Sequence, residues 1–318
     1  MDRMYFVGVD TTGSQIRRIF PRWAELLGLD AELVGIDIPL GAEADAFREA
    51  MATIATDPAS RGGLVTTHKV SVYRHALQAF HELDRWATLC GEVSCVARRD
   101  GRLHGWAKDP ITSWEAFVAI AGPDYFARYR DAEVLCLGAG GSGTAFTARL
   151  LVADHPPARI TVTNRSPERL SIVRELHARI GSQVAVEYRS VELPEDSDTL
   201  VGRLPPHSVV VNATGLGKDR PGSPITDAAE FPVGAIAWEF NYRGDLQFLE
   251  QARRQADARR LTVEDGWRYF LEGWASHVAE VFGLAIGAER FAELAAAAAE
   301  LQRTSAATSG TGGREIPS

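Results

Sequence analysis

The sequence predicts an α/β protein of two domains, and three features of the chain lead to this prediction. Its 318 residues exceed the length of a typical single domain. Strand-like and helix-like hydrophobic patterns alternate along most of the chain, which is typical of parallel strands with helices on both faces. After residue 266 the alternation stops, and two helical patterns follow in succession at 269–283 and 287–303.

The first half carries three strand patterns, each followed by a helical pattern. We expect the strands at 5–10, 31–40 and 62–69, and the helices at 14–28, 43–55 and 70–80. Residues 92–109 then predict a hairpin whose turn contains Asp100 and Gly101. A helix near 113–122 would connect this half to the next.

The second half begins at 133–154 with a strand, a glycine-rich turn and a helix. Further along we expect a strand at 158–166, a helix at 167–181, and strands at 184–190, 208–215 and 235–242. This alternation predicts a parallel sheet in the second half.

Charge and composition exclude several classes of protein. The formal net charge of −8 argues against general binding to a nucleic-acid backbone, so any basic site must be local. The three cysteines, Cys90, Cys95 and Cys136, form no CxxC pair, and an odd number argues against a disulfide framework. The chain has neither a signal-peptide pattern nor an apolar run of about 18 residues. We therefore expect a cytoplasmic protein with no nucleic-acid or membrane partner and no metal site.

The strongest motif is Gly138-Ala139-Gly140-Gly141-Ser142-Gly143, which fits G-x-G-x-x-G. It follows a buried strand pattern directly and opens a helical one. Glycines there permit a tight turn and a close backbone approach to a pyrophosphate, and the helix start supplies free N–H groups. The motif predicts a dinucleotide site; the alternative is a plain tight turn.

The next strand pattern ends in Asn164-Arg165-Ser166, and Arg169 follows one turn later. A carboxylate at this place would bind the ribose 2′-hydroxyl of NAD, but this chain offers two guanidinium groups instead. Arginine suits a bidentate grip on a 2′-phosphate, which favours NADP as the cofactor. The alternative is a pair of arginines at a helix start that face solvent.

Lys69 is one of only three lysines in the chain, among many arginines. It lies near the start of a helical pattern, where a cation opposes the helix dipole. Lysine, unlike arginine, can give up its proton, so Lys69 is a candidate acid–base residue; the alternative is a solvated lysine. Asp109 precedes a proline, and by itself such an aspartate is usually a turn or cap residue.

The order of motifs resembles the shikimate dehydrogenase family over nearly the whole chain, to about residue 302. The segment SQIRRIFPRWAELLGLD resembles the family's substrate segment, which starts S-x-S. VTTHK resembles N-V-T-x-P-x-K, GRLHGWAKD resembles G-x-x-x-G-x-N-T-D, and GAGGSGTA with NRS resembles the phosphate loop and NADP clamp. VVNATGLG, EFNYRGDLQFLEQA and EDGWRYFLEGWA resemble later motifs around the nicotinamide and substrate.

The resemblance implies roles for specific residues. Lys69 and Asp109 would form the proton-transfer pair, with Asp109 orienting and tuning the lysine. The resemblance assigns the nicotinamide side of a Rossmann-type cofactor site to Asn212, Ala213, Thr214 and Gly215. The implied substrate-binding positions are Ser14, Thr66, Ser94, Phe240 and Gly273.

Several substrate-binding positions depart from the family pattern. Ile16 replaces the second serine of S-x-S, and Ala107 with Lys108 replaces the asparagine and threonine of N-T-D. Ser94 stands for an asparagine, Phe240 for a tyrosine and Gly273 for a glutamine. A site that has lost such groups prefers a different ligand, so we expect shikimate itself to be a poor substrate. Lys108 or Lys218 could supply a cation for an acidic substrate, although a solvated loop lysine is the more ordinary interpretation.

We therefore expect residues 1–110 and 267–302 to form a substrate domain, 111–266 an NADP-binding domain, and 303–318 a disordered tail. The expected activity interconverts a secondary alcohol and a ketone on a shikimate-like small cyclic polyol or hydroxy acid, in a monomer or homodimer. Two alternatives remain, shikimate 5-dehydrogenase itself and a non-catalytic NADP-binding sensor. The retained Lys69 and Asp109 argue against related dehydrogenases of amino acids, aldehydes or folates.

Overall fold

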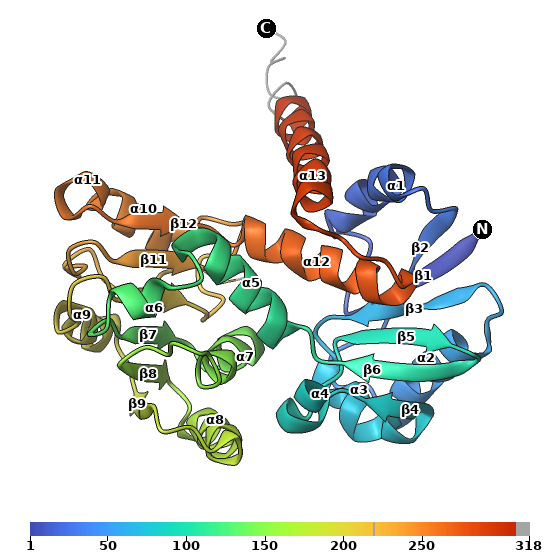
Figure 1. The fold of residues 1–318 in the computed structure, drawn as a ribbon, viewed down its shortest axis with the longest axis horizontal. Helices are drawn as coiled ribbons and strands as arrows, with labels where there is room; N and C mark the ends of the chain where they lie inside the picture. Colours follow the sequence, from blue (N-terminus) through green and yellow to red (C-terminus); the bar gives the residue numbers. More distant parts are fainter. Residues whose placement is uncertain (219, 310–318) are drawn as a thin grey trace, which may run out of the picture. The chain divides into compact units, whose positions relative to one another are not determined.

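The computed structural model of the chain describes residues 1–218 and 220–309. The chain folds into two compact units (Figure 1). Unit 1 comprises Met1–Lys108 and the chain from Trp274 onward, and unit 2 comprises Asp109–Gly273. The chain therefore leaves unit 1 at residue 108 and returns to it within its last long helices.

Unit 1 contains a mixed six-stranded sheet. Its strands are β1 (Asp2–Gly8), β2 (Ala31–Asp37), β3 (Ser60–Val65), β4 (Phe80–Leu83), β5 (Cys95–Arg99) and β6 (Arg102–Trp106). They lie in the order β2-β1-β3-β5-β6-β4. β1 pairs in parallel with β2 and β3, whereas β5 runs antiparallel to both β3 and β6. The predicted hairpin is thus present, with Asp100 and Gly101 at positive φ in its turn.

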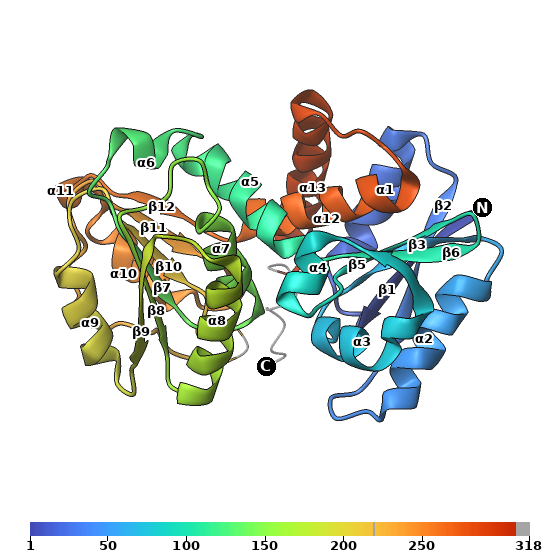
Figure 2. The same ribbon diagram turned by 60° about the horizontal axis from the view of Figure 1, so that its bottom comes forward.

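Helices cover both faces of this sheet (Figure 2). They are α1 (Ile16–Leu27), α2 (Ala44–Thr56), α3 (Lys69–Ala76) with the short η1 (Leu77–Ala79), α4 (Arg85–Cys90), α12 (Trp267–Phe282) and α13 (Ala288–Ser309). On one face, α2 and α3 bury residues such as Met51 and Val72 with Val7 of β1. On the other, Phe6 meets Trp274 of α12 edge to face, with 5.1 Å between ring centroids.

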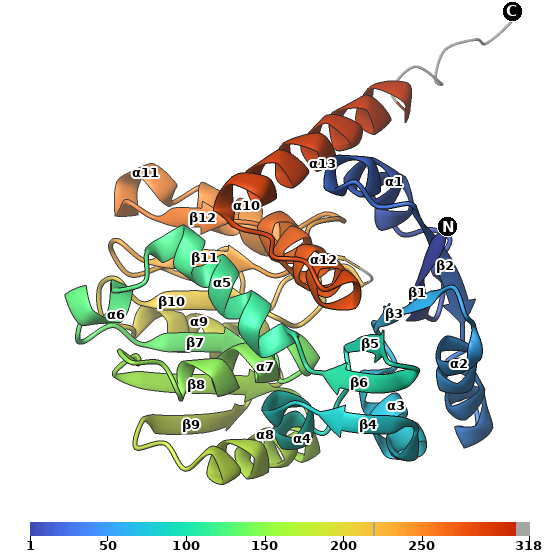
Figure 3. The ribbon, with the colours of Figure 1, turned by 45° about the vertical axis from the view of Figure 1, so that its right-hand side comes forward.

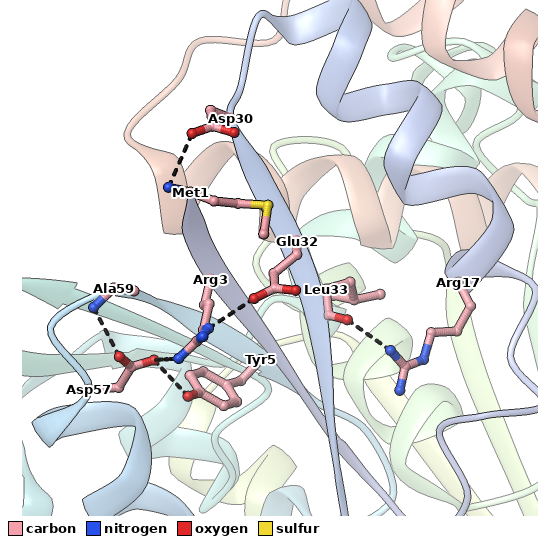
Figure 4. A network of polar contacts seen from close by, with 9 residues as sticks. All are labelled: Met1, Arg3, Tyr5, Arg17, Asp30, Glu32, Leu33, Asp57 and Ala59. Carbon is pink, nitrogen blue, oxygen red and sulfur yellow. Dashed lines mark hydrogen bonds and ion pairs between the residues drawn. The ribbon is translucent and has the colours of Figure 1, made fainter.

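The start of β1 is tied to its neighbours by a polar network (Figure 4). Arg3 Nε donates to Glu32 of β2 at 2.9 Å, and Tyr5 Oη donates to Asp57 at 2.7 Å. Arg17 of α1 donates to the Leu33 carbonyl of β2 at 2.8 Å. These contacts attach α1 to β2 and the end of α2 to β1.

Unit 2 contains a six-stranded sheet in which every strand is parallel. The strands are β7 (Val134–Leu137), β8 (Arg159–Asn164), β9 (Ala185–Ser190), β10 (Val209–Asn212), β11 (Ile236–Glu239) and β12 (Thr262–Glu264), in the order β12-β11-β10-β7-β8-β9. Figure 3 shows this order across the sheet. The chain moves outward from β7 to β9, then returns to β10 on the other side of β7. The carboxyl ends of β7 and β10 therefore flank the switch point where open α/β sheets bind ligands.

The central strands β7, β10 and β11 of unit 2 are buried along their whole length because helices cover both faces of the sheet. The helices are α5 (Asp109–Ala121), α6 (Tyr125–Arg128), α7 (Gly141–Leu150), α8 (Pro167–Ile180), α9 (Pro194–Gly202), α10 (Gln247–Arg253) and α11 (Ala256–Arg259). Val134 of β7 packs with α5 to α8, whereas Leu135 packs with α9 and α10. This alternation along one strand is what a doubly covered parallel sheet requires.

The two-sheet α/β class predicted from the sequence is confirmed, but some elements differ. α13 runs to Ser309, so residues 303–309, which we expected in a disordered tail, are helical. The rest of that expected tail, 310–318, lies outside the described residues. β4, β12 and several short helices were not predicted. Within 1–218 and 220–309, no helix combines the length and hydrophobicity that a membrane span needs.

Candidate functional site

The glycine-rich turn lies at the switch point of unit 2, and two of its glycines are required by the backbone. Gly138 has φ +112°, and a Cβ there would lie 2.6 Å from the Ala213 carbonyl oxygen. A Cβ on Gly143 would lie 2.5 Å from the Gly138 carbonyl oxygen. Real Cβ atoms do not approach so closely. Glycine at 138 therefore lets the turn pack against the residue after β10, and glycine at 143 lets α7 pack against the turn.

The other two glycines leave room for a ligand. A Cβ on Gly141 would meet no described atom within 4 Å, and one on Gly140 would meet only Ala213 O, at 3.9 Å. α7 begins at Gly141 without a side-chain cap. Its first N–H groups, including those of Ser142 and Gly143, therefore have no intrahelical acceptor. Open space before an uncapped helix start is the geometry that a bound phosphate would need, and Ala139 packs into the core.

The residues after β8 form a cationic site. Asn164 Oδ1 accepts from Ser166 N at 2.9 Å, and Ser166 Oγ accepts from Arg169 N at 3.3 Å, which caps α8. Arg165 and Arg169 are both exposed. Neither guanidinium is paired with a carboxylate in the described part of the chain. Both are thus available to an added phosphate group.

The loop after β10 contains the predicted residues Asn212, Ala213, Thr214 and Gly215. Asn212 is fully buried, and its Oδ1 accepts from Thr214 N at 3.1 Å and from Thr214 Oγ1 at 2.7 Å. Thr214 Oγ1 in turn accepts from Leu216 N at 3.1 Å. Asn212 therefore shapes the loop, while the loop backbone approaches the glycine turn at Gly138.

The sequence reasoning missed Glu239, the last residue of β11. Its carboxylate is fully buried and accepts from Asn212 Nδ2, from Asn241 N at 2.8 Å and from Asn241 Nδ2 at 2.7 Å. Burial raises the pKa of Glu239 to about 7, against the lowering effect of these donors. A glutamate that ends the otherwise apolar strand pattern AIAWE was the available signal.

Two predicted substrate residues of unit 2 have different surroundings. The Phe240 ring is 9% exposed and packs in the core against Trp238, with 4.6 Å between centroids. Gly273 lies in α12, and a Cβ there would meet no described atom within 4 Å. Phe240 thus contributes packing, whereas the space at Gly273 is open.

The candidate residues of unit 1 gather at the carboxyl ends of its central strands. Thr66 follows β3, and Lys69 N donates to the Thr66 carbonyl at 3.3 Å as α3 begins. Val93 N donates to the Lys69 carbonyl at 3.1 Å, which ties α3 to the start of the hairpin. Ser14 lies half-buried before α1, and Ile16, which replaces the second serine, is fully buried.

Ser94 and Lys108 have roles that differ from those expected. Ser94 is fully buried, and its Oγ accepts from Lys108 N at 2.8 Å. Lys108 Nζ lies 2.6 Å from Glu280 Oε2 of α12 and only 8% of the residue is exposed. The interpretation of Lys108 as a solvated loop lysine is therefore wrong, because the side chain is buried in an ion pair. Lys218, the other lysine considered, is half-buried.

Asp109 directly follows this fixed segment and is the first residue of α5. It is 8% exposed, and it begins unit 2, whereas Lys69 belongs to unit 1. Among the described residues, no three His, Cys, Asp or Glu side chains gather to hold a metal ion.

No family model matches the chain. The shikimate dehydrogenase (NADP(+)) of Caulobacter vibrioides is 29% identical over 246 residues, 76% of each chain. That of Streptococcus sanguinis is 29% identical over 175 residues, and the match spans 55% of this chain and 58% of the enzyme. The chain is therefore a distant homologue of shikimate dehydrogenases, which are oxidoreductases that act on CH–OH groups.

Several solved structures share the fold of this chain. Quinate dehydrogenase from Corynebacterium glutamicum, in complex with NAD, has a TM-score of 0.73 at 17% identity, over 92% of this chain and 98% of that one. The 5-ketofructose reductase of Gluconobacter sp. strain CHM43 has a TM-score of 0.69 at 20% identity, over 94% and 98%. Shikimate 5-dehydrogenase of Thermus thermophilus, in complex with shikimate, has 0.67 at 25% identity, over 94% and 98%.

Proposed function

We propose that this protein is an NADP-dependent oxidoreductase that interconverts a secondary alcohol and a ketone on a small cyclic polyol or hydroxy acid. The observation that carries the proposal is the uncapped, open start of α7 at Gly140 and Gly141. A phosphate of a dinucleotide fits that place, and the homology to NADP-dependent shikimate dehydrogenases supports the chemistry.

The choice of NADP rests on Arg165 and Arg169. Both are exposed after β8, where a dinucleotide of this fold places its adenosine ribose. A 2′-phosphate would form charge-assisted hydrogen bonds with the two guanidinium groups. When bound, the nucleotide supplies hydride transfer to or from the reacting carbon. The turn 138–143 would hold its pyrophosphate, and the loop 212–215 would border its nicotinamide.

Lys69 and Asp109 are the proposed proton-transfer pair. A secondary alcohol must lose a proton from its oxygen as hydride leaves its carbon, and a ketone must gain one in reverse. Lys69 would donate or accept that proton, and Asp109 would orient the lysine and stabilise its charged form. The segment before Asp109 is held firmly, because Ser94 fixes the Lys108 backbone and Glu280 fixes its ammonium group.

The substrate is proposed to differ from shikimate. Ser14, Thr66 and the open space at Gly273 remain candidates for direct contact with the substrate. Ser94, Ile16 and Phe240 are buried, so they would shape the pocket indirectly. Structural relatives named for quinate and 5-ketofructose suggest the polyols to try first. We also propose a cytoplasmic enzyme that is a monomer or homodimer.

The deciding experiment follows reduced-nicotinamide absorbance with the purified protein. NADP and NAD would each be tested with shikimate and quinate at saturating concentration, and NADPH and NADH with 5-ketofructose. We expect turnover with NADP(H) on a polyol other than shikimate. Rapid NADP reduction with shikimate would instead identify a shikimate 5-dehydrogenase. Failure to bind either nucleotide by calorimetry would refute the proposed function.

A further inference from the structure

Glu239 is a buried acid that the proposed proton transfer does not use. Both of its carboxylate oxygens accept hydrogen bonds. Oε2 accepts from Asn212 Nδ2, at the end of β10, and Oε1 accepts from both the backbone and the side chain of Asn241. All three donors are neutral amides in unit 2, so the carboxylate has no cation to balance it among them.

Each of the two asparagines holds one part of the loop after β10. Asn212 Oδ1 accepts from the backbone and hydroxyl of Thr214. Asn241 Nδ2 also donates to the Leu216 carbonyl at 3.3 Å. Glu239 is therefore hydrogen-bonded to both asparagines that hold residues 213–217. This is the loop whose Ala213 carbonyl lies against Gly138.

We propose that Glu239 is a positioning residue whose carboxylate fixes the loop 213–217 and thereby sets the affinity of the site for its nicotinamide nucleotide. The proposal rests on the proposed function for the nucleotide, but the state of the loop can be measured without it.

The negative charge matters because an ionised carboxylate only accepts hydrogen bonds. A glutamine, or a protonated glutamate, presents a donor to one of the three amide donors. Rotating the Asn212 amide to relieve that conflict would break its bonds to Thr214. The loop should then loosen whenever the carboxylate is lost.

The charged surroundings of Glu239 set the direction of the pH effect. β10 presents the neutral Asn212, and the segment after β11 presents the neutral Asn241. Asp265, which follows β12, repels the Glu239 carboxylate, and this repulsion raises the pKa of Glu239 further. Glu264, the last residue of β12, has its pKa raised by burial and by Asp265. With its pKa near 7, Glu239 becomes ionised as the pH rises from about 6 to about 8.

The test uses the full chain and two readouts. Hydrogen exchange of residues 213–217 is followed by mass spectrometry without nucleotide, and the Kd for NADPH is measured by its fluorescence. The variants are Glu239→Gln, the matched control Glu264→Gln on the neighbouring strand, and Thr214→Val, which removes the hydroxyl grip while leaving Glu239 intact. Thermal melts establish whether each variant is folded. If Glu239→Gln does not fold, the loop is tested with Thr214→Val instead.

We expect Glu239→Gln to speed exchange in the loop and to raise the Kd at about pH 8 by at least about tenfold. Glu264→Gln should change neither, and Thr214→Val should shift both in the same direction by less. Between about pH 6 and about pH 8 the wild-type Kd should fall up to about tenfold relative to Glu239→Gln, a comparison that cancels titration of the nucleotide itself.

Unchanged loop exchange and unchanged Kd in folded Glu239→Gln, or in Thr214→Val if the former does not fold, would overturn the proposal. A wild-type protein that binds neither NADPH nor NADH would overturn the proposed function and the affinity part of this inference. Faster loop exchange in Glu239→Gln would then still establish the positioning of the loop itself.

Discussion

At the scale of single residues, Lys69 is the most informative side chain. It begins α3, where a cation gains nothing from the helix dipole, and its carbonyl is tied to the hairpin through Val93. We predict that Lys69→Ala lowers kcat by about 10²- to 10⁴-fold, the usual contribution of a positioned acid–base group. The Kd for NADPH should stay unchanged, because the lysine belongs to unit 1.

Steady-state kinetics on the substrate found by the absorbance assay would check this. Arg74→Ala is the matched control, since it removes an exposed cation from the last turn of the same helix. Full turnover by Lys69→Ala would show that another group handles the proton.

The two arginines after β8 make a second prediction at this scale. Replacing both Arg165 and Arg169 by alanine should raise the Kd for NADPH by about 10- to 100-fold, since charge-assisted hydrogen bonds to the 2′-phosphate are lost. The Kd for NADH should hardly move, because that nucleotide lacks the phosphate. Fluorescence titration at low and high salt would measure both constants.

Arg189→Ala provides the comparison for this pair. Arg189 is exposed on the neighbouring strand β9 and already pairs with Glu187 at 3.1 Å. If the double variant loses affinity for NADH as much as for NADPH, the arginines do not select the 2′-phosphate.

At the scale of elements, the glycine turn separates a structural requirement from a functional one. Gly138→Ala puts a Cβ against the Ala213 carbonyl at a φ of +112°, so it should lower the free energy of unfolding by at least about 1–3 kcal/mol. Gly141→Ala places its methyl in open space at a helix start, so stability should be kept. It should nevertheless weaken NADPH binding, because the methyl occupies the place proposed for the phosphate.

Denaturant unfolding and fluorescence titration of the two variants distinguish these effects. The proposal for the turn fails if Gly141→Ala binds NADPH as tightly as the wild type.

The elements show which parts of a fold the sequence can predict. The sequence predicts β7 with α7, and the hairpin β5–β6, because each combines a clear hydrophobic pattern with a turn at which the backbone needs glycine. β4 was missed because its four residues, FHEL, are polar at the centre and carry no alternation. β12 has only three residues, and pairing with β11 rather than its own pattern makes it a strand.

The candidate site was predictable where a motif acts through its backbone, and less so where side chains meet from distant segments. Nothing near Lys108 in the sequence indicates that Glu280, 172 residues later, lies beside it. Glu239 and Asn212 are 27 residues apart and meet because β10 and β11 are paired. Phe240 was expected at the substrate, but its place after β11 turns the ring into the core of unit 2.

At the scale of the whole molecule, unit 1 depends on both ends of the chain. Trp23 of α1 is fully buried, and its Nε1 donates to the Leu294 carbonyl of α13 at 2.8 Å. We predict that ending the chain after residue 284 exposes Trp23 and destabilises unit 1 while unit 2 keeps its stability. Hydrogen exchange resolved by segment would show faster exchange in 1–108 and unchanged exchange in 109–273.

A chain ended after residue 309 is the control, since it retains all of α13. Equal protection of 1–108 in the shorter variant and in this control would mean that α13 is dispensable for unit 1.

The discontinuity of unit 1 also has a consequence for how the protein is made. Translation runs from the N-terminal side, so the strands of unit 1 leave the ribosome before unit 2, and α12 and α13 leave after it. All of unit 2 is synthesised in between and can complete its sheet. At that stage Trp274, the partner of Phe6, and Leu294, the partner of Trp23, have not yet been synthesised. While unit 2 is synthesised, the newly made chain therefore carries apolar residues of unit 1 that lack their partners in α12 and α13, and a chaperone could bind them during that interval.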